Sequence, residues 1–258
     1  MLSEVLDLST YPIASDSFKA KSKATLVKDG ALVLPNFLQA AAIQKIHKEG
    51  VDSQKKAYFK TQFHNVYLTL SNPQYLENHA CNRQVVSSKG CITDDQISTN
   101  SALRVLYNSE EFKAFLCYVL GEDKLFPYAD PLSSINLHYA KNGQELGWHF
   151  DNSSFAITLM IQPPESGGQF EYVSNVRDAD NGEMSFEMVD SILDGEIVPK
   201  ELSMAAGSLV LFRGRNAIHR VAPNTGDVTR MLVVLAYNSQ PGVSLSESAR
   251  MTFYGRLD

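Results

Sequence analysis

The sequence has few cysteines and no motif that would cluster them. Three cysteines occur among 258 residues, at Cys81, Cys91 and Cys117, and none belongs to a CxxC pair. A sparse, odd set argues against a disulfide framework and fits a reducing compartment. We therefore expect buried or spare thiols, and any bound metal must use histidine and carboxylate ligands.

Long basic runs and long apolar runs are missing as well. The net charge is −6, and without a basic patch the electrostatic footprint of a nucleic-acid or anionic-membrane binder is absent. The N-terminus lacks a cationic segment followed by an apolar stretch, and no apolar run is long enough to span a bilayer. These absences predict a cytoplasmic protein with a small-molecule substrate and no nucleic-acid or membrane partner, and they leave the oligomeric state open.

What is present fits one domain with a large core. Hydrophobic residues make up 44% and charged residues 20% of the chain, which is ordinary for a folded domain, and β-rich folds of this length often form a single unit. In residues 1–126 the run ALVLPNF (31–37) predicts a strand, and residues 38–50 predict a helix that stops at Gly50. A second helix is expected over 109–120, with Ser109 as its cap and Gly121 just past its end. We expect residues 1–126 to be mainly helical support.

Residues 127–258 change to a β texture. Short runs rich in β-branched and aromatic residues alternate with turn signals, namely SINLHYA, FAITLMIQ, GQFEYV, GSLVLFRG and TRMLVVLAYN. An insert at 174–200 holds seven carboxylates and little β periodicity, so it is expected outside the sheet or as a lid. The pattern predicts an α+β fold, a β-barrel or sandwich that N-terminal helices buttress.

His149 and Asp151 are the first candidate metal ligands. They stand two apart in WHFD, and in an extended strand this spacing turns both side chains to one face and Phe150 to the other. Two histidines and one carboxylate form the facial triad of non-haem iron(II), which leaves three positions open for cosubstrate and oxygen. His219, after the run GSLVLFRGRNAI, is the candidate third ligand.

Other interpretations of these residues remain. His-x-Asp arises by chance in many proteins, and two histidines with one aspartate also suit a zinc hydrolase, although no HExxH motif is present. A barrel that binds a ligand without turnover is a further alternative, because a fold does not fix a function. The ordered set of motifs favours the iron site.

Arg230 follows His219 by eleven residues and precedes the apolar run MLVVL. An unpaired arginine in a strand buried on both faces would be costly, whereas its planar fork can bind a ligand carboxylate bidentately. The distal carboxylate of 2-oxoglutarate is such a group. Arg213, Arg215 and Arg220 are competitors for this role.

The motifs together resemble the Fe(II)/2-oxoglutarate oxygenase superfamily. The resemblance lies in LGWHFDNSSFAITLMIQPPESGGQFEYV, GSLVLFRGRNAIHRVAP and TRMLVVLAYNSQPG, and it covers about Pro127 to the C-terminus. The chain is most similar to the free amino acid radical halogenases of the lysine halogenase type and their hydroxylase relatives. This resemblance implies a double-stranded β-helix (jelly-roll, cupin-like) barrel, with Fe(II), 2-oxoglutarate as cosubstrate and O2.

The resemblance also bears on the reaction. The halogenases have Gly where this chain has Asp151, and that Gly leaves a coordination position vacant for chloride. With the carboxylate present, we expect a dioxygenase that hydroxylates an unactivated C–H bond and yields succinate and CO2. Halogenase-like or other 2-oxoglutarate oxidation is the alternative. The subgroup implies a free amino acid as substrate, possibly lysine or another basic or polar one.

Four further residues are candidates for ligand contacts. Asn136 and His138 share one face of SINLHYA, and either could contact 2-oxoglutarate or substrate, or simply be hydrogen-bonded within the strand. Asn152 directly follows Asp151 and could shape the substrate pocket. Trp148 precedes His149 and is expected to pack beside the site. Asp130 and the insert carboxylates could receive a substrate ammonium, although a solvated acidic loop is the commoner explanation.

Overall fold

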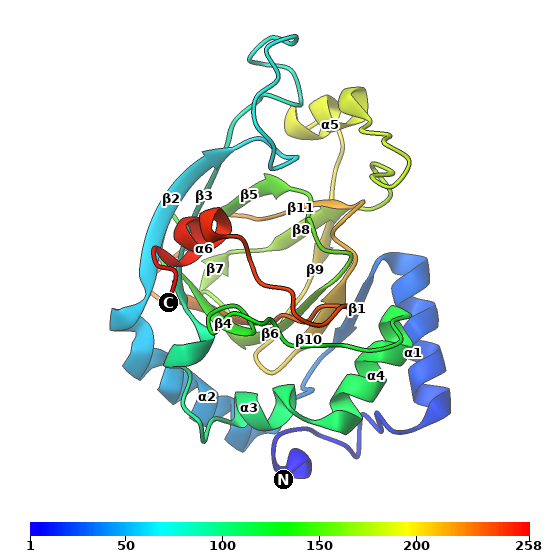
Figure 1. Cartoon of the computed structure of the whole chain (residues 1–258), viewed down its shortest axis with the longest axis vertical. Helices are drawn as coiled ribbons and strands as arrows, with labels where there is room; N and C mark the ends of the chain where they lie inside the picture. The colour runs from blue at the N-terminus through cyan, green and yellow to red at the C-terminus, as the bar shows by residue number, and fades with distance from the viewer.

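Antiparallel pairing joins eleven strands into one sheet that curls into a barrel (Figure 1). The computed structural model describes residues 1–258. Along the sheet the strand order is β1-β10-β6-β13-β4-β3-β5-β11-β8-β9, with β2 paired to β3, and β7 and β12 form a separate pair. The strands are β1 (Ala31–Leu34), β2 (Tyr58–His64), β3 (Val85–Ile92), β4 (Ile135–Ala140), β5 (Leu146–His149), β6 (Ala156–Gln162), β7 (Ser166–Gly167), β8 (Phe170–Val173), β9 (Lys200–Leu202), β10 (Leu209–Phe212), β11 (Ile218–Val221), β12 (Asn224–Thr225) and β13 (Arg230–Leu235).

Helices cover one side of this barrel. Four of them, α1 to α4, lie along the outer face of the sheet. Helix α6 lies against β2 and β3, and α5 lies at the end of the molecule away from α1 to α4 (Figure 1). The helices are α1 (Asp16–Asp29), α2 (Ala40–Ser53), α3 (Ala102–Tyr107), α4 (Glu110–Leu120), α5 (Phe186–Leu193) and α6 (Glu247–Tyr254), with 3-10 turns η1 (Leu2–Glu4), η2 (Gln54–Lys56) and η3 (Asp94–Gln96). No helix has the length and hydropathy needed to cross a membrane.

The predicted α+β jelly-roll architecture is confirmed, and α4 shows why its ends could be predicted. Ser109 Oγ accepts a hydrogen bond from the backbone N–H of Phe112 at 3.2 Å, which satisfies a donor that the first turn leaves free. Gly121 ends the helix with φ of 80°, a conformation that other residues adopt only under strain. Each of the five runs in residues 127–258 contains one strand, at β4, β6, β8, β10 and β13.

The predicted helix stop at Gly50 is wrong. Helix α2 continues to Ser53, and Gly50 lies buried inside it. A Cβ at Gly50 would lie 2.9 Å from Cδ2 of Leu137, and the Gly50 carbonyl accepts a hydrogen bond from the Tyr139 hydroxyl at 2.7 Å. This glycine therefore lets the helix approach strand β4 closely, and it does not end the helix.

The N-terminal half also supplies strands that the sequence pattern did not predict. Strand β2 pairs with β3 over its whole length. Strand β3 then bridges the two sides of the barrel, because Gly90 to Ile92 pair with β4 and Ser87 pairs with Leu146 of β5. Residues 1–126 thus contribute to the wall of the barrel as well as to its helical support.

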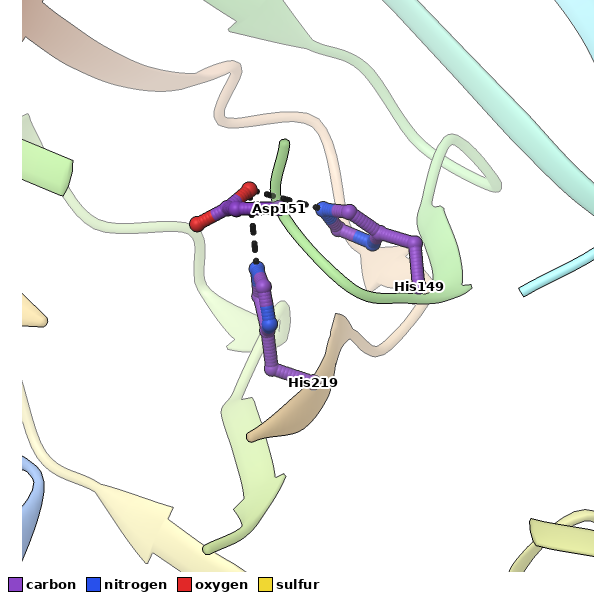
Figure 2. A group of neighbouring side chains, drawn as sticks. All are labelled: His149, Asp151 and His219. Carbon is purple, nitrogen blue, oxygen red and sulfur yellow. Dashed lines mark ion pairs between the residues drawn. The ribbon is translucent and has the colours of Figure 1, made fainter. Parts of the chain in front are cut away.

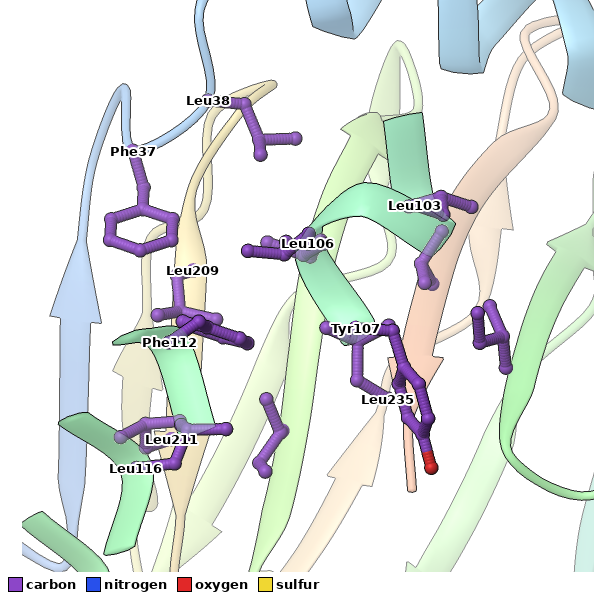
Figure 3. Packing of buried hydrophobic residues seen from close by; sticks show 14 of the residues in the cluster. Phe37, Leu38, Leu103, Leu106, Tyr107, Phe112, Leu116, Leu209, Leu211 and Leu235 are labelled. Carbon is purple, nitrogen blue, oxygen red and sulfur yellow. The ribbon is translucent and has the colours of Figure 1, made fainter. Parts of the chain in front are cut away.

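The structure has two large clusters of buried hydrophobic residues. The larger has 34 buried residues between the sheet and helices α1 to α4, and Figure 3 shows leucine and aromatic side chains interleaving there. The second cluster has 10 buried residues, among them Trp148, Phe150 and Ile218, and it joins β5 and β11 to segments 66–81 and 176–192. The acidic insert therefore packs outside the sheet, where Tyr67 donates to the Met184 carbonyl at 2.8 Å.

Candidate metal centre

Three side chains converge where β5 and β11 lie side by side. His149 ends β5 and is the register partner of His219 in β11, while Asp151 follows β5 by two residues. Asp151 Oδ1 lies 3.8 Å from Nε2 of His149 and 3.6 Å from Nε2 of His219. One ligand atom of each residue lies within 4.8 Å of the others, and Figure 2 shows the three facing one another. A single ion could contact all three.

Backbone carbonyls fix the orientation of both imidazoles. His149 Nδ1 lies 2.8 Å from the Gly147 carbonyl, and His219 Nδ1 lies 3.0 Å from the Ala217 carbonyl. Because a carbonyl only accepts, each Nδ1 carries the proton, and each Nε2 turns its lone pair toward the shared space. Burial, and then the neighbouring His219, lower the pKa of His149 to about 3, so its neutral form is available to bind a metal at ordinary pH.

Asp151 supplies an ionised oxygen that has no protein partner. Although burial opposes its charge, its pKa lies below the usual value. Oδ2 is buried without a hydrogen bond. The backbone holds the residue in place, because its N–H donates to the Gly214 carbonyl at 3.0 Å. Two neutral nitrogens and one orphaned carboxylate are a donor set that suits Fe(II).

Gly214 is tightly fitted to this carboxylate. A Cβ built on Gly214 would lie 1.9 Å from Asp151 Oδ2, a separation that non-bonded atoms do not reach. Position 214 therefore has to be glycine as long as position 151 carries aspartate in this orientation.

A hydrogen-bond chain supports His149 from strands β2 and β3. Ser87 Oγ accepts from the Gly147 N–H at 3.0 Å and contacts Nε2 of His64 at 2.7 Å. The other ring nitrogen of His64 lies 3.0 Å from the Asn65 carbonyl, so the serine hydroxyl donates to Nε2. The His64 ring stands edge-on to His149 at 6.4 Å between centroids. This chain holds Gly147, the residue whose carbonyl orients the His149 ring.

Arg230 begins β13 as a buried cation without a partner. Its side chain is 5% exposed, and neither Nε nor Nη2 has a hydrogen bond. Burial lowers its pKa to about 10, and it remains charged at neutral pH. An unpaired buried guanidinium is unfavourable by itself, so its fork fits a ligand carboxylate.

The three competing arginines are engaged elsewhere. Arg213 donates to the Leu120 carbonyl at 2.7 Å, Arg215 pairs with Asp180 at 2.8 Å, and Arg220 pairs with Glu171 at 2.5 Å. Only Arg230 among the four candidates is left with buried unpaired nitrogens.

Strand β4 places His138 diagonally across from Arg230, and Asn136 lies further along the strand, opposite Val234. In the register of β4 and β13, Arg230 is opposite Ala140, and His138 is opposite Leu232. Asn136 is hydrogen-bonded within its surroundings, because its amide donates to the Leu132 carbonyl at 2.8 Å and its oxygen accepts from Tyr254 at 2.9 Å. Burial, and then nearby Lys89, hold the pKa of His138 well below its ordinary value.

The structure does not bring Trp148 and Asn152 to the metal side chains. Trp148 alternates with His149 along β5, faces the second cluster and has the Arg220 guanidinium 4.8 Å from its ring centroid. Asn152 is exposed, and its carbonyl accepts from Arg215 at 3.1 Å. The Asp130 carboxylate is engaged in hydrogen bonds within the protein, because it accepts from the Leu132 and Leu245 N–H groups and from the Ser133 hydroxyl.

The sequence reasoning missed four residues around the site, namely His64, Ser87, Lys89 and Gly214. Ser87 and Lys89 alternate along VVSSKGCI, and period-two alternation could have marked one face of this segment. Nothing in the sequence shows that this face turns inward. His64 and Gly214 carry no local signal, because their roles depend on contacts with distant strands.

Comparisons with known proteins agree with this geometry. A profile of the family described as Halogenase D matches residues 15–252. A search of curated proteins gave no significant match. The similar solved structures include a 2OG-Fe(II) oxygenase family oxidoreductase from Burkholderia pseudomallei, with TM-score 0.55, 14% identity and coverage of 88% of this chain and 93% of that one.

Two further solved structures have the same fold. The alpha ketoglutarate dependent epimerase SnoN of nogalamycin biosynthesis has TM-score 0.59 and 14% identity, covering 86% of this chain and 84% of that one. A prolyl hydroxylase from Trichoplax adhaerens has TM-score 0.54 and 12% identity, covering 90% and 93%. Since the family profile spans nearly all of the chain, this protein belongs to the Halogenase D family and is a non-haem Fe(II) and 2-oxoglutarate dependent oxygenase.

Proposed function

We propose that this oxygenase hydroxylates an unactivated C–H bond of a small substrate, a free amino acid, and converts 2-oxoglutarate and O2 to succinate and CO2. One observation carries the proposal. Asp151 stands with His149 and His219 as a third protein donor, with ligand atoms of all three within 4.8 Å. A complete facial triad leaves room for the cosubstrate and oxygen only.

In this proposal His149, Asp151 and His219 hold the iron. Bound iron, together with 2-oxoglutarate and O2, supplies the oxidising power that breaks a C–H bond. The chain supplies position. The Gly147 and Ala217 carbonyls keep both Nε2 atoms aimed at the ion, and the unpaired Arg230 fork binds the distal carboxylate of 2-oxoglutarate.

Halogenation is the second candidate, because the family bears the name Halogenase D. The donor set argues against it. Asp151 occupies the place that a halide would need, and Gly214 is packed against its carboxylate. The substrate radical would therefore recapture a hydroxyl group.

The amino acid substrate is supported by the resemblance to the free amino acid halogenases and their hydroxylase relatives. Asn136 and His138 are proposed to face the cosubstrate and substrate, since both line one cavity. Asn152 is proposed to border the entrance, where it is exposed beside Asp151.

The test begins with anaerobic binding. Purified protein with Fe(II) should develop a visible charge-transfer band when 2-oxoglutarate is added, and the His219→Ala variant should not. In air, a pool of amino acids should yield succinate, and mass spectrometry should find one member with an added oxygen atom. A zinc-dependent hydrolase would show neither result.

The Asp151→Gly variant distinguishes the two oxidations. Hydroxylation should collapse in this variant, with or without chloride, while 2-oxoglutarate still binds through Arg230. A chlorinated product from the unaltered protein in chloride buffer would overturn the hydroxylase proposal.

A further inference from the structure

Lys89 is a half-buried cation near the metal centre. It projects from β3, and protein surrounds it except where it lines a cavity. Burial lowers its pKa although the charge of nearby Asp151 opposes this, and it forms no ion pair with a carboxylate. Its ammonium lies 3.2 Å from Nδ1 and 3.3 Å from Nε2 of His138, and the unprotonated nitrogen of this neutral ring can accept one of its three donors. The remaining N–H groups are free for a ligand.

The cavity beside Lys89 has a volume of 170 Å³, well below the range of about 300–1,000 Å³ that is typical for drug-sized ligands. Its polar lining comes from Lys89, His138, Asn136 and Ser133, and the rest is apolar or aromatic. Helix α6 and the preceding segment contribute Leu245, Phe253 and Tyr254. None of the 11 lining residues is Asp or Glu. The cavity thus offers a positive charge at one place and apolar surface elsewhere.

The balance of charges around the centre suggests a substrate anion as the partner of Lys89. Bound Fe(II) would be neutralised by Asp151 and by the keto-acid carboxylate of 2-oxoglutarate, and Arg230 would neutralise the distal carboxylate. Lys89 then remains a positive charge without an ion-pair partner, and such a charge in a partly enclosed cavity is unfavourable unless a ligand pairs with it. A substrate anion would complete the balance.

We propose that the cavity beside Lys89 binds the carboxylate of a small acid whose hydrocarbon end is uncharged, either an amino acid or a simple carboxylic acid. This inference rests on the proposed function and narrows it. A basic side chain would place a second ammonium in the cavity, where no Asp or Glu is available to pair with it. Lysine and its analogues are therefore poor ligands of this cavity.

Binding measurements test the inference without turnover. Norleucine, hexanoate, norleucinamide and lysine are titrated by calorimetry into anaerobic protein with Fe(II), with and without saturating 2-oxoglutarate. At least one of norleucine and hexanoate should bind in both conditions. Norleucinamide and lysine should bind at least about tenfold more weakly. Comparing the affinities of norleucine and hexanoate then shows whether the cavity prefers an amino acid or a simple carboxylic acid.

Two variants locate the contact. Lys89→Met should weaken binding of the acid at least about tenfold and leave 2-oxoglutarate binding within about twofold of its original affinity. Lys60→Met is the matched control, because Lys60 is the exposed register partner of Lys89 in β2. This control should bind every probe as the unaltered protein does.

Several outcomes would overturn the inference. These are equal binding of norleucine and norleucinamide, tighter binding of lysine, failure of both acids to bind, or a loss of 2-oxoglutarate affinity in Lys89→Met as large as in Arg230→Met. The proposed function fails differently, by the absence of a charge-transfer band. The titrations without 2-oxoglutarate still test the cavity in that case.

Discussion

Strands β4, β6 and β13 carry one face of the barrel under helices, whereas β5 and β11 carry the metal-binding side chains. The first region buries 34 residues in one apolar cluster, and the second buries 10 beside three ligands with an unpaired carboxylate oxygen. Apolar burial stabilises the fold, while preorganised polar groups reduce stability until a ligand pairs with them. Substitutions in the two regions should therefore separate folding from ligand binding.

The largest effect is expected at the ligands. His219→Ala removes one of three metal donors, and iron binding and turnover should be lost completely. Metal-free stability should stay the same or rise, because the substitution takes away a buried polar ring. Iron content after anaerobic loading and urea unfolding measure the two properties. The control is His79→Ala, outside the site, and stoichiometric iron in His219→Ala would contradict the assignment.

The helix-covered region should respond in the opposite way. Phe112 in α4 is fully buried, and Phe112→Ala should lower the free energy of unfolding by about 3–5 kcal/mol through lost burial and a cavity. The remaining folded protein should bind iron with unchanged affinity. Val105 in α3 is 41% exposed, and Val105→Ala should change stability by no more than about 0.5 kcal/mol.

Substitution of Arg230 tests whether this unpaired cation contributes to ligand binding or to the stability of the fold. Arg230→Met should weaken 2-oxoglutarate binding by about 100-fold, because the distal carboxylate loses a bidentate partner. Stability should not fall, since no protein group pairs with this guanidinium. Titration of the charge-transfer band measures the first effect. Arg215→Met, which breaks an ion pair at the surface, should leave that titration unchanged.

The smallest effect is a pH dependence at His138. Burial keeps its folded-state pKa well below the ordinary value of about 6.5. The unfolded chain therefore takes up a proton that the folded protein does not, and stability is lost as pH falls below about 6.5. One such proton contributes about 1.4 kcal/mol per pH unit. Urea unfolding at pH 6 and pH 5 should show a shallower decline for His138→Gln than for the unaltered protein.

The His149 and Asp151 pair could be predicted from the sequence because its geometry depends on local spacing. His149 and Asp151 are two residues apart, so an extended backbone turns both toward one side. His219 was predicted from the order of the motifs, and the structure shows that its strand, β11, pairs with β5. The ends of α4 were predictable for the same reason, since Ser109 and Gly121 act on adjacent backbone groups.

The remaining features depend on contacts between distant segments. Strand β3 mixes polar and apolar residues, and the pattern does not say which face turns toward the barrel interior, so Ser87 and Lys89 were missed. Gly50 resembles a helix stop, but the close approach of Leu137 explains it. In each case a neighbour far along the chain decides the role of the residue.

The fit between Gly214 and Asp151 makes these two positions interdependent. A methyl group at 214 clashes with the carboxylate at 151, so Gly214→Ala should displace this ligand and impair iron binding. Once position 151 is glycine, the same methyl group finds space, but it then fills the volume into which a halide would enter. Conversion of this site to halogenation therefore requires two glycines facing each other, one of which the chain already has.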